Sequence, residues 1–263
     1  MTDATPLDLA HRLMTAEPDN DALRLRFYER FADGEAFLLL ETEAEGENLT
    51  PQLFNLEDGP VVLAFDREDR LAAFTDAPAP YAALPGRVIV GLLAGQGIGL
   101  GINLSVAPSS MLLGPDAVDW LADSLGNAPA EVEAKPQSLH APAGLPEALL
   151  TALDAKLARA GGLAASAYLA GVTYQDGRRG HMLAFIDPAP GADGALAKAA
   201  AEALTFSGIE AGEMDVTFLR SSDPAAAALA RMGLRFDLTL PEPPAPEPRK
   251  APGSDPNAPP ILR

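Results

Sequence analysis

Apolar residues recur at helical spacing near the start of the chain. Leu9, Leu13 and Met14 fall on one face of a helix that we expect over residues 7–16. A second helix follows, and we expect Gly34 to end it in a left-handed conformation, which glycine adopts at little cost. The inward stripe of this second helix is expected to hold Leu23, Phe27, Tyr28 and Phe31.

Short apolar runs and turns follow the helical pair. Strands are expected at residues 36–40 and 61–65, and residues 71–74 are expected to return as a strand beside the second of these. Prolines punctuate the next stretch, so residues 81–84 are interpreted as a loop or a short helix. The acidic residues that precede the second strand around Gly46 indicate a solvated loop, because they lack the spacing of a calcium-binding loop.

The run over residues 86–94 leaves two alternatives, a short buried helix or a strand. Arg87 and the three residues that follow it favour a strand by propensity, whereas the end of the run before Gly95 favours a capped helix, which is our preferred interpretation. A buried strand over residues 98–104 should follow. Pro115 then begins a helix that ends at Gly126 and is expected to bury Trp120.

The second half of the chain predicts the element order α-β-β-α-β-α-β. Its clearest local signal is Asp176-Gly177, because Asp-Gly is a strong two-residue hairpin turn. The expected elements are a helix over 146–160, strands over 163–174 and 179–186, a helix over 195–206, a strand over 214–219, a helix from Pro224 and a strand over 234–240.

These elements predict an α+β protein of two domains, each a small mixed sheet covered by helices. We place the first domain at residues 1–126, a linker at 127–143 and the second domain at 144–240. Residues 241–263 are rich in proline, alanine and charge, and such a composition cannot bury enough apolar surface to offset the entropy of ordering. A disordered tail is therefore expected there.

Charge and composition narrow the function classes. The formal net charge is −18, and residues 1–130 contain no lysine, which argues against nucleic acid and anionic membranes as partners. The absence of cysteine excludes disulfides, thiolate metal sites and a cysteine nucleophile. The chain begins without the basic and apolar regions of a signal peptide, so a cytoplasmic location is expected.

Motifs for catalysis or cofactor binding are missing. The glycines from Gly95 to Gly101 do not have the spacing of a dinucleotide fingerprint, and no lysine completes a phosphate-binding loop. A strand whose glycines allow close packing is the preferred interpretation, with a binding loop as the alternative. No serine lies in a nucleophile elbow, and the three histidines have no positioned partner in the sequence. We therefore expect no catalytic residues, no metal and no cofactor.

Three segments, in this order and spacing, carry a resemblance to a known family. They are Leu71-Ala72-Ala73-Phe74-Thr75, then Gly97-Ile98-Gly99-Leu100-Gly101-Ile102-Asn103-Leu104, and then Leu112-Leu113-Gly114-Pro115-Asp116-Ala117-Val118-Asp119-Trp120-Leu121. Over roughly residues 5–126 they resemble the N-terminal domain of the SseB family, the enhanced serine sensitivity proteins. The second domain is similar to that family's C-terminal domain in its order of elements alone.

The resemblance implies a bacterial cytoplasmic protein and supplies no catalytic residues. This sequence departs from the family pattern at Asn103, which is followed by Leu104 where the family often has proline. The resemblance therefore implies no role for that turn. The family name also suggests an amino acid such as serine as a ligand.

Our first functional hypothesis is a non-enzymatic binding or regulatory module that contacts an unidentified protein partner. Residues 94–113 are uncharged and loop-prone in a charged domain, and long loops of this kind are often functional. We expect the contact surface to be lined by Asn103, Ser105, Ser109 and Ser110.

The alternative hypothesis is a sensor of, or an enzyme for, an amino acid such as serine. Backbone amides of the glycine-rich strand would bind its carboxylate, and Arg87 would supply the counter-charge. A third possibility is a structural role as a homo-oligomer, which the sequence does not separate from the first hypothesis.

Overall fold

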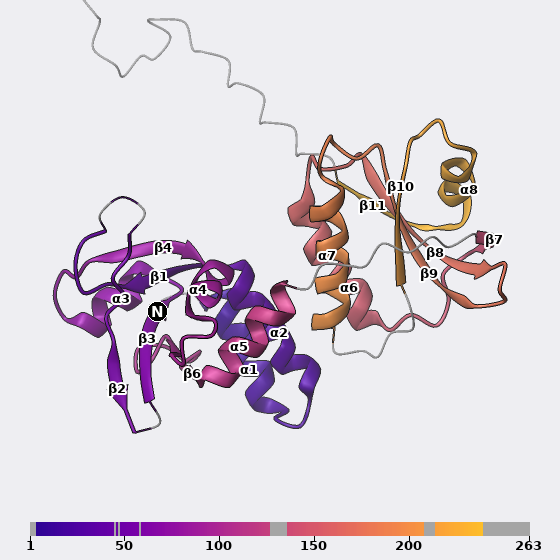
Figure 1. The fold of residues 1–263 in the computed structure, drawn as a ribbon. Helices are drawn as coiled ribbons and strands as arrows, with labels where there is room; N and C mark the ends of the chain where they lie inside the picture. Colours follow the sequence, from indigo (N-terminus) through magenta and orange to yellow (C-terminus); the bar gives the residue numbers. More distant parts are fainter. Residues whose placement is uncertain are drawn as a thin grey trace, which may run out of the picture.

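The computed structural model describes residues 4–44, 46, 48–57, 59–126, 136–207 and 214–238. It has two mixed sheets, each covered by helices, which confirms the α+β fold class (Figure 1). We refer to residues 4–126 as the N-terminal unit and to residues 136–238 as the C-terminal unit. The tail expected at 241–263 lies outside the described residues.

The N-terminal unit is built on a sheet with the strand order β4-β1-β3-β5-β6, in which β2 also pairs with β3. The β3–β5 pair is parallel and the others are antiparallel. Its elements are α1 (Pro6–Ala16), α2 (Asp21–Asp33), β1 (Glu35–Leu39), β2 (Phe54–Leu56), β3 (Gly59–Phe65), α3 (Glu68–Thr75), β4 (Tyr81–Pro85), α4 (Gly86–Leu93), β5 (Gly99–Ile102), β6 (Met111–Leu113) and α5 (Pro115–Gly126).

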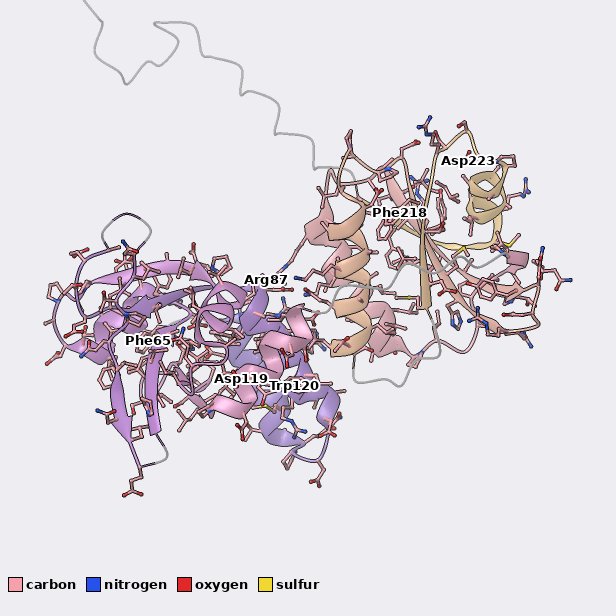
Figure 2. All side chains as sticks on the ribbon, in the orientation of Figure 1. Phe65, Arg87, Asp119, Trp120, Phe218 and Asp223 are labelled. Atoms are coloured by element: carbon pink, nitrogen blue, oxygen red, sulfur yellow. The ribbon has the colours of Figure 1, made fainter. Side chains whose placement is uncertain are left out.

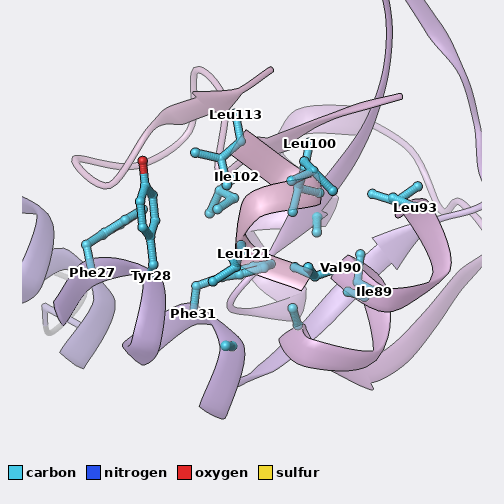
Figure 3. Close-up of a cluster of buried hydrophobic side chains, with 14 of the residues drawn as sticks. Phe27, Tyr28, Phe31, Ile89, Val90, Leu93, Leu100, Ile102, Leu113 and Leu121 are labelled. Carbon is cyan, nitrogen blue, oxygen red and sulfur yellow. The ribbon is translucent and has the colours of Figure 1, made fainter. Parts of the chain in front are cut away.

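The two faces of this sheet bury different side chains because successive residues of a strand point to opposite sides. One face packs under α1, α2, α4 and α5, and Leu38, Val62 and Ile102 are fully buried there. Figure 3 shows the helical side of this core, where Ile89 and Leu121 meet residues of the sheet. The opposite face carries a smaller cluster beneath α3.

The C-terminal unit has the strand order β10-β9-β8-β11, and β7 also pairs with β8. Helices α6 and α7 pack on one face of this sheet, and α8 packs on the other. Its elements are β7 (Pro136–His140), α6 (Glu147–Leu157), a 3₁₀ turn η1 (Ala158–Ala160), β8 (Ser166–Tyr174), β9 (Arg179–Ile186), α7 (Asp193–Phe206), β10 (Met214–Leu219), α8 (Pro224–Met232) and β11 (Leu234–Asp237).

Several local predictions are confirmed. The hairpin of β8 and β9 turns at Gly177, which has a φ of 86°. Residues 86–93 form the helix α4. A Cβ atom on Gly99 would lie 2.7 Å from the Leu113 carbonyl oxygen, and one on Gly101 would lie 2.6 Å from a Leu104 methyl carbon. These two glycines therefore allow the close packing that the sequence predicts.

Two elements were assigned wrongly from the sequence. Residues 71–74 are not a strand but lie within the helix α3, whose first turn holds Glu68 and Asp69. Residues 81–84 belong to the strand β4, an edge strand that pairs with β1. Proline is tolerated at a sheet edge because its missing N–H need not join a ladder, and this explains why Pro85 did not prevent the strand.

Other errors concern which face of a helix is buried. Leu9 and Leu13 are 48% and 45% exposed, and α1 is buried through Leu7 and Ala10 instead. Trp120 is 43% exposed rather than in the core.

Two further predictions, on a helix end and on the linker, were also wrong. Gly34, expected in a left-handed conformation, has a φ of −84°. Finally, residues 136–140 of the expected linker are strand β7 of the second sheet, while residues 127–135 lie outside the described ranges.

The two units contact each other through helices, with α7 against α2 and α5. Phe206, the last residue of α7, is 2% exposed and belongs to the hydrophobic cluster of the N-terminal unit. The junction is therefore a packed interface in which one unit inserts an aromatic side chain into the core of the other.

Candidate functional site

The loop after β5 folds inward onto α1, contrary to the expected contact surface. Asn103 and Ser109 are fully buried, and Asn103 has a left-handed φ of 49°. The Asn103 side-chain amide donates a hydrogen bond of 2.9 Å to Ser109 Oγ, and Ser109 Oγ donates one of 2.6 Å to Asp8 Oδ1. The backbone N–H of Asp66 donates to Asn103 Oδ1 at 3.1 Å. These two residues hold the loop in place and are not available to a partner.

Arg70 completes this polar cluster. Its guanidinium donates to Asp8 Oδ1 at 3.0 Å and to Asp66 Oδ1 at 2.8 Å. Thr5, the N-cap of α1, donates its hydroxyl to Asp66 Oδ2 at 2.6 Å and caps α1 reciprocally with Asp8. The cluster therefore joins the start of α1, the end of β3, α3 and the loop that follows β5.

Asp8 is 2% exposed, and burial alone would raise its pKa. The hydrogen bonds from Arg70 and Ser109 outweigh burial and hold the pKa of this carboxyl far below its usual value of 3.8. Asp8 is therefore a buried, fully hydrogen-bonded carboxylate. Ser109 donates directly to this carboxylate, and no described histidine lies between them, so the pair does not form a catalytic triad.

Asp8→Asn is expected to lower the free energy of unfolding by about 3 kcal/mol at neutral pH, because it leaves Arg70 short of a buried counter-charge. A carboxyl whose folded-state pKa is lowered stabilises above its unfolded pKa and loses this contribution as the pH falls. The deficit should therefore shrink below about pH 4, which urea titrations at several pH values would measure. A deficit that stays constant with pH would contradict the ion-pair explanation.

Ser105 and Ser110 are the exposed members of the expected surface. The backbone N–H of Ser105 lies 3.4 Å from Ser110 Oγ, and Ser105 has a φ of 64°. This contact closes the loop on its solvent side, so the two serines remain accessible while their neighbours Asn103 and Ser109 do not.

Arg87 lies at the junction of the two units (Figure 2) and not with the serine loop residues in their polar cluster. Its guanidinium donates bonds of 3.1 Å to both carboxylate oxygens of Glu202 on α7 and pairs with Asp33 of α2. Arg87 is therefore committed to a bidentate ion pair, and the expected counter-charge for a ligand at the glycine-rich strand is not placed there.

Lys156 of α6 is at the centre of the charges around Arg87 and is only 5% exposed. Its ammonium lies 2.8 Å from Asp33 Oδ2, 2.8 Å from Glu202 Oε2 and 3.4 Å from Glu29 Oε1. We call this group the interface ion cluster; its members are Glu29, Asp33, Arg87, Lys156, Arg159 and Glu202. Three acids and three bases from both units make the cluster formally neutral.

Burial raises the pKa of Glu29, and neighbouring Lys156 only partly opposes this. For Asp33 and Glu202 burial also acts to raise the pKa, but hydrogen bonds from Lys156 and Arg87 prevail and lower it. Glu29 Oε1 is buried and lacks a hydrogen bond in the described chain, because its contact with Lys156 is an ion pair without hydrogen-bond geometry. Glu29 is thus the least satisfied acid of the cluster.

A different surface, which sequence reasoning did not separate from the serine loop, lies on α4. The residues from Val88 to Pro115 carry no charge. Ile89, Val90 and Leu93 point into the core (Figure 3), while Val88 and Leu92 are 41% and 45% exposed. We call the exposed uncharged residues here the α4 face; they are Val88, Gly91, Leu92, Ala94, Gly95, Gln96 and Gly97.

Acidic side chains border the α4 face. The Asp119 side chain on α5 accepts a hydrogen bond of 2.8 Å from the backbone N–H of Gly95, which ties the turn after α4 to α5. Asp116 and Asp123 lie on the exposed side of the same helix. The surface is therefore apolar in the middle and negative along this edge.

The described ranges contain no group of three or more metal-ligating side chains that could hold a metal ion. Among the helices that the structure describes, none combines the length and apolar character needed to cross a bilayer. Comparisons of the chain with protein-family models, curated proteins and solved structures found no match. The resemblance to the SseB family therefore stays a prediction.

Proposed function

We propose that the protein is a non-enzymatic binding module that contacts a protein partner through the α4 face. The observation that carries the proposal is the exposure of Val88 and Leu92 on the part of α4 that follows Arg87, which is uncharged, in a chain of net charge −18. Exposed apolar surface in an otherwise charged molecule is typical of an interaction site. The buried half of α4 fixes the helix, so the exposed half is presented on a rigid support.

The chemistry of this surface favours a basic, amphipathic segment as its occupant. Apolar side chains of such a helix would cover Val88 and Leu92, and its lysines or arginines would face Asp119 and its acidic neighbours. Charge complementarity of this kind steers association and selects partners. The proposal keeps the protein-partner hypothesis but moves the site from the serine loop to α4. A bacterial cytoplasmic role of the SseB type is part of the same proposal.

Leu92→Arg is expected to reduce partner capture at least tenfold, because a charge at the centre of a dry apolar contact must be desolvated. The exposed side chain tolerates arginine in the free protein, which circular dichroism would check. Tagged full-length chain would be used to capture proteins from its own host, and each captured protein would be quantified by mass spectrometry.

Leu234→Arg is the matched control, since Leu234 is 41% exposed but lies on β11 of the other unit. The proposal requires a protein whose capture is lost with Leu92→Arg and kept with Leu234→Arg. Equal capture by both variants, or capture of nothing by the unmodified chain, would remove the α4 face as the docking site.

A further inference from the structure

A second site, independent of the α4 face, lies in a pocket between the two units. Its walls come from α2 of the N-terminal unit and from α6 and α7 of the C-terminal unit, and its volume is about 210 Å³. The polar residues that line it are Asn20, Arg26, Glu29, Arg30, Thr151 and Ser207. The rest of the lining is apolar and small, mostly alanine with Leu23 and Phe206.

Two arginines in this pocket have no ion-pair partner among the described residues. Arg26 and Arg30 are one helical turn apart on α2, and neither makes a hydrogen bond or salt bridge to any described residue. Other described arginines, such as Arg24 and Arg70, do form ion pairs with nearby acids. A guanidinium offers a fork of donors that matches a carboxylate, so the pair is suited to an anionic group.

The same pocket holds a carboxylate with spare capacity. Glu29 lies between the two arginines in the sequence of α2, and its side chain is 14% exposed. Its Oε1 is buried beside the Lys156 ammonium at 3.4 Å without a hydrogen bond, and no described group donates to its Oε2. A bare anion in the pocket would meet this carboxylate as well as the arginines, whereas a ligand that also carries an ammonium group would satisfy both.

Two helix ends of opposite electrostatic sign meet at the pocket, the N-terminus of α2 and the C-terminus of α7. Asn20 is the N-cap of α2 but donates its side chain to Glu17 and leaves the first amides of α2 uncapped, which adds positive potential. Ser207 follows the last turn of α7, where helix carbonyls add negative potential. The pocket is therefore dipolar, with arginines and an N-terminus contributing one sign and Glu29 and a C-terminus the other.

We infer that this pocket binds a small dipolar molecule that carries both a carboxylate and an ammonium group, such as a free α-amino acid. The carboxylate is held by Arg26 and Arg30, and the ammonium is held by Glu29. The volume is below the roughly 300–1,000 Å³ of drug-sized ligand sites, which limits the occupant to a small side chain. Because both units form the walls, the ligand would also brace the interface.

The common α-amino acids, tested singly at millimolar concentration on the full chain, would reveal the ligand by thermal shift. A ligand that binds only the folded state raises its stability by mass action, so at least one small amino acid should raise the Tm in a saturable way. Calorimetry on that amino acid would then give a Kd. No shift with any amino acid would overturn the inference.

Variants and analogues identify the site and the class. Arg30→Gln and Glu29→Gln should each weaken binding about tenfold or more, because each removes a charge-assisted hydrogen bond. Arg24→Gln is the control on the same helix, since Arg24 pairs with Asp21 and does not line the pocket. Unchanged binding in the two pocket variants, or equal binding of acetate alone, would contradict the dipolar site. Capture of a protein partner through α4 would be unaffected by either result.

Discussion

Lys156→Met is expected to lower the free energy of unfolding by about 3–5 kcal/mol at neutral pH. Lys156 is 5% exposed and provides the ammonium that Asp33 and Glu202 share at 2.8 Å each. Methionine keeps the apolar stem of the side chain beside Phe206 but removes the charge, so three acids of the interface ion cluster must share the two remaining arginines. Urea denaturation followed by circular dichroism would measure the loss.

The pH dependence of this loss has a definite sign. Lys156 lowers the pKa of Asp33 and Glu202 in the folded protein, so these acids stabilise above their usual values near 3.8 and 4.5 and lose that contribution as the pH falls. Without Lys156 their folded-state pKa values rise, and protonation in mild acid relieves the unpaired charge. The difference between the two proteins should therefore narrow between about pH 7 and pH 4.

Lys198→Met serves as the control for Lys156→Met, because Lys198 lies on α7 of the same unit and pairs with no acid among the described residues. Its effect should stay within about 0.5 kcal/mol. If Lys156→Met costs no more than Lys198→Met, the cluster does not hold the two units together.

Phe206→Ala is the second change with a large expected effect, about 3–5 kcal/mol. The ring of Phe206 is 2% exposed and fills the N-terminal core from the end of α7, so its loss leaves a cavity between the units. Because the interface couples the units, the variant should also lose cooperativity and unfold in two steps. Denaturation followed by fluorescence of Trp120 and by far-UV circular dichroism would separate these steps.

Phe206→Leu keeps most of the buried volume and should cost clearly less than Phe206→Ala. A cost below about 1 kcal/mol for Phe206→Ala, together with a single transition, would show that α7 contributes little to the N-terminal core.

Local signals in the sequence were sufficient to predict the conformation of a segment where one short motif determines it. The Asp176-Gly177 turn sets the β8–β9 hairpin. Of the two alternatives for residues 86–94, the helix that ends before Gly95 was correct and the strand was not. The stripe of Phe27 and Phe31 correctly located the buried side of α2. In each case, residues within a few positions of each other specify the conformation.

The misassigned elements are short or lie at sheet edges. Residues 71–74 form an apolar run of a length that fits either a strand or one helical turn, and only Leu71 of α3 is buried. The strands β4 and β7 contain Pro85 and Pro136, which indicate breaks unless the strand is known to lie at an edge. Edge position is a property of the whole sheet and cannot be read from the local sequence.

The site residues depended on contacts between distant parts of the chain. Asn103 and Ser109 are polar residues of the type usually found in solvent-exposed loops. In the structure they are buried because they form hydrogen bonds with Asp8 and Asp66, which are distant in the sequence. Lys156 similarly meets Asp33 across more than 100 positions. The absence of charge from the segment that includes Leu92 was visible in the sequence; its division into a buried and an exposed side was not.

The most direct test of the proposed function is photo-crosslinking from the α4 face in the native host. A photoreactive amino acid would replace Leu92 in one chain and, as the control, Leu234 in another; both positions are exposed. The account predicts a discrete adduct with one protein from position 92, through a basic and apolar segment of that protein, and no such adduct from position 234. No adduct at position 92, or the same adducts at both positions, would contradict it.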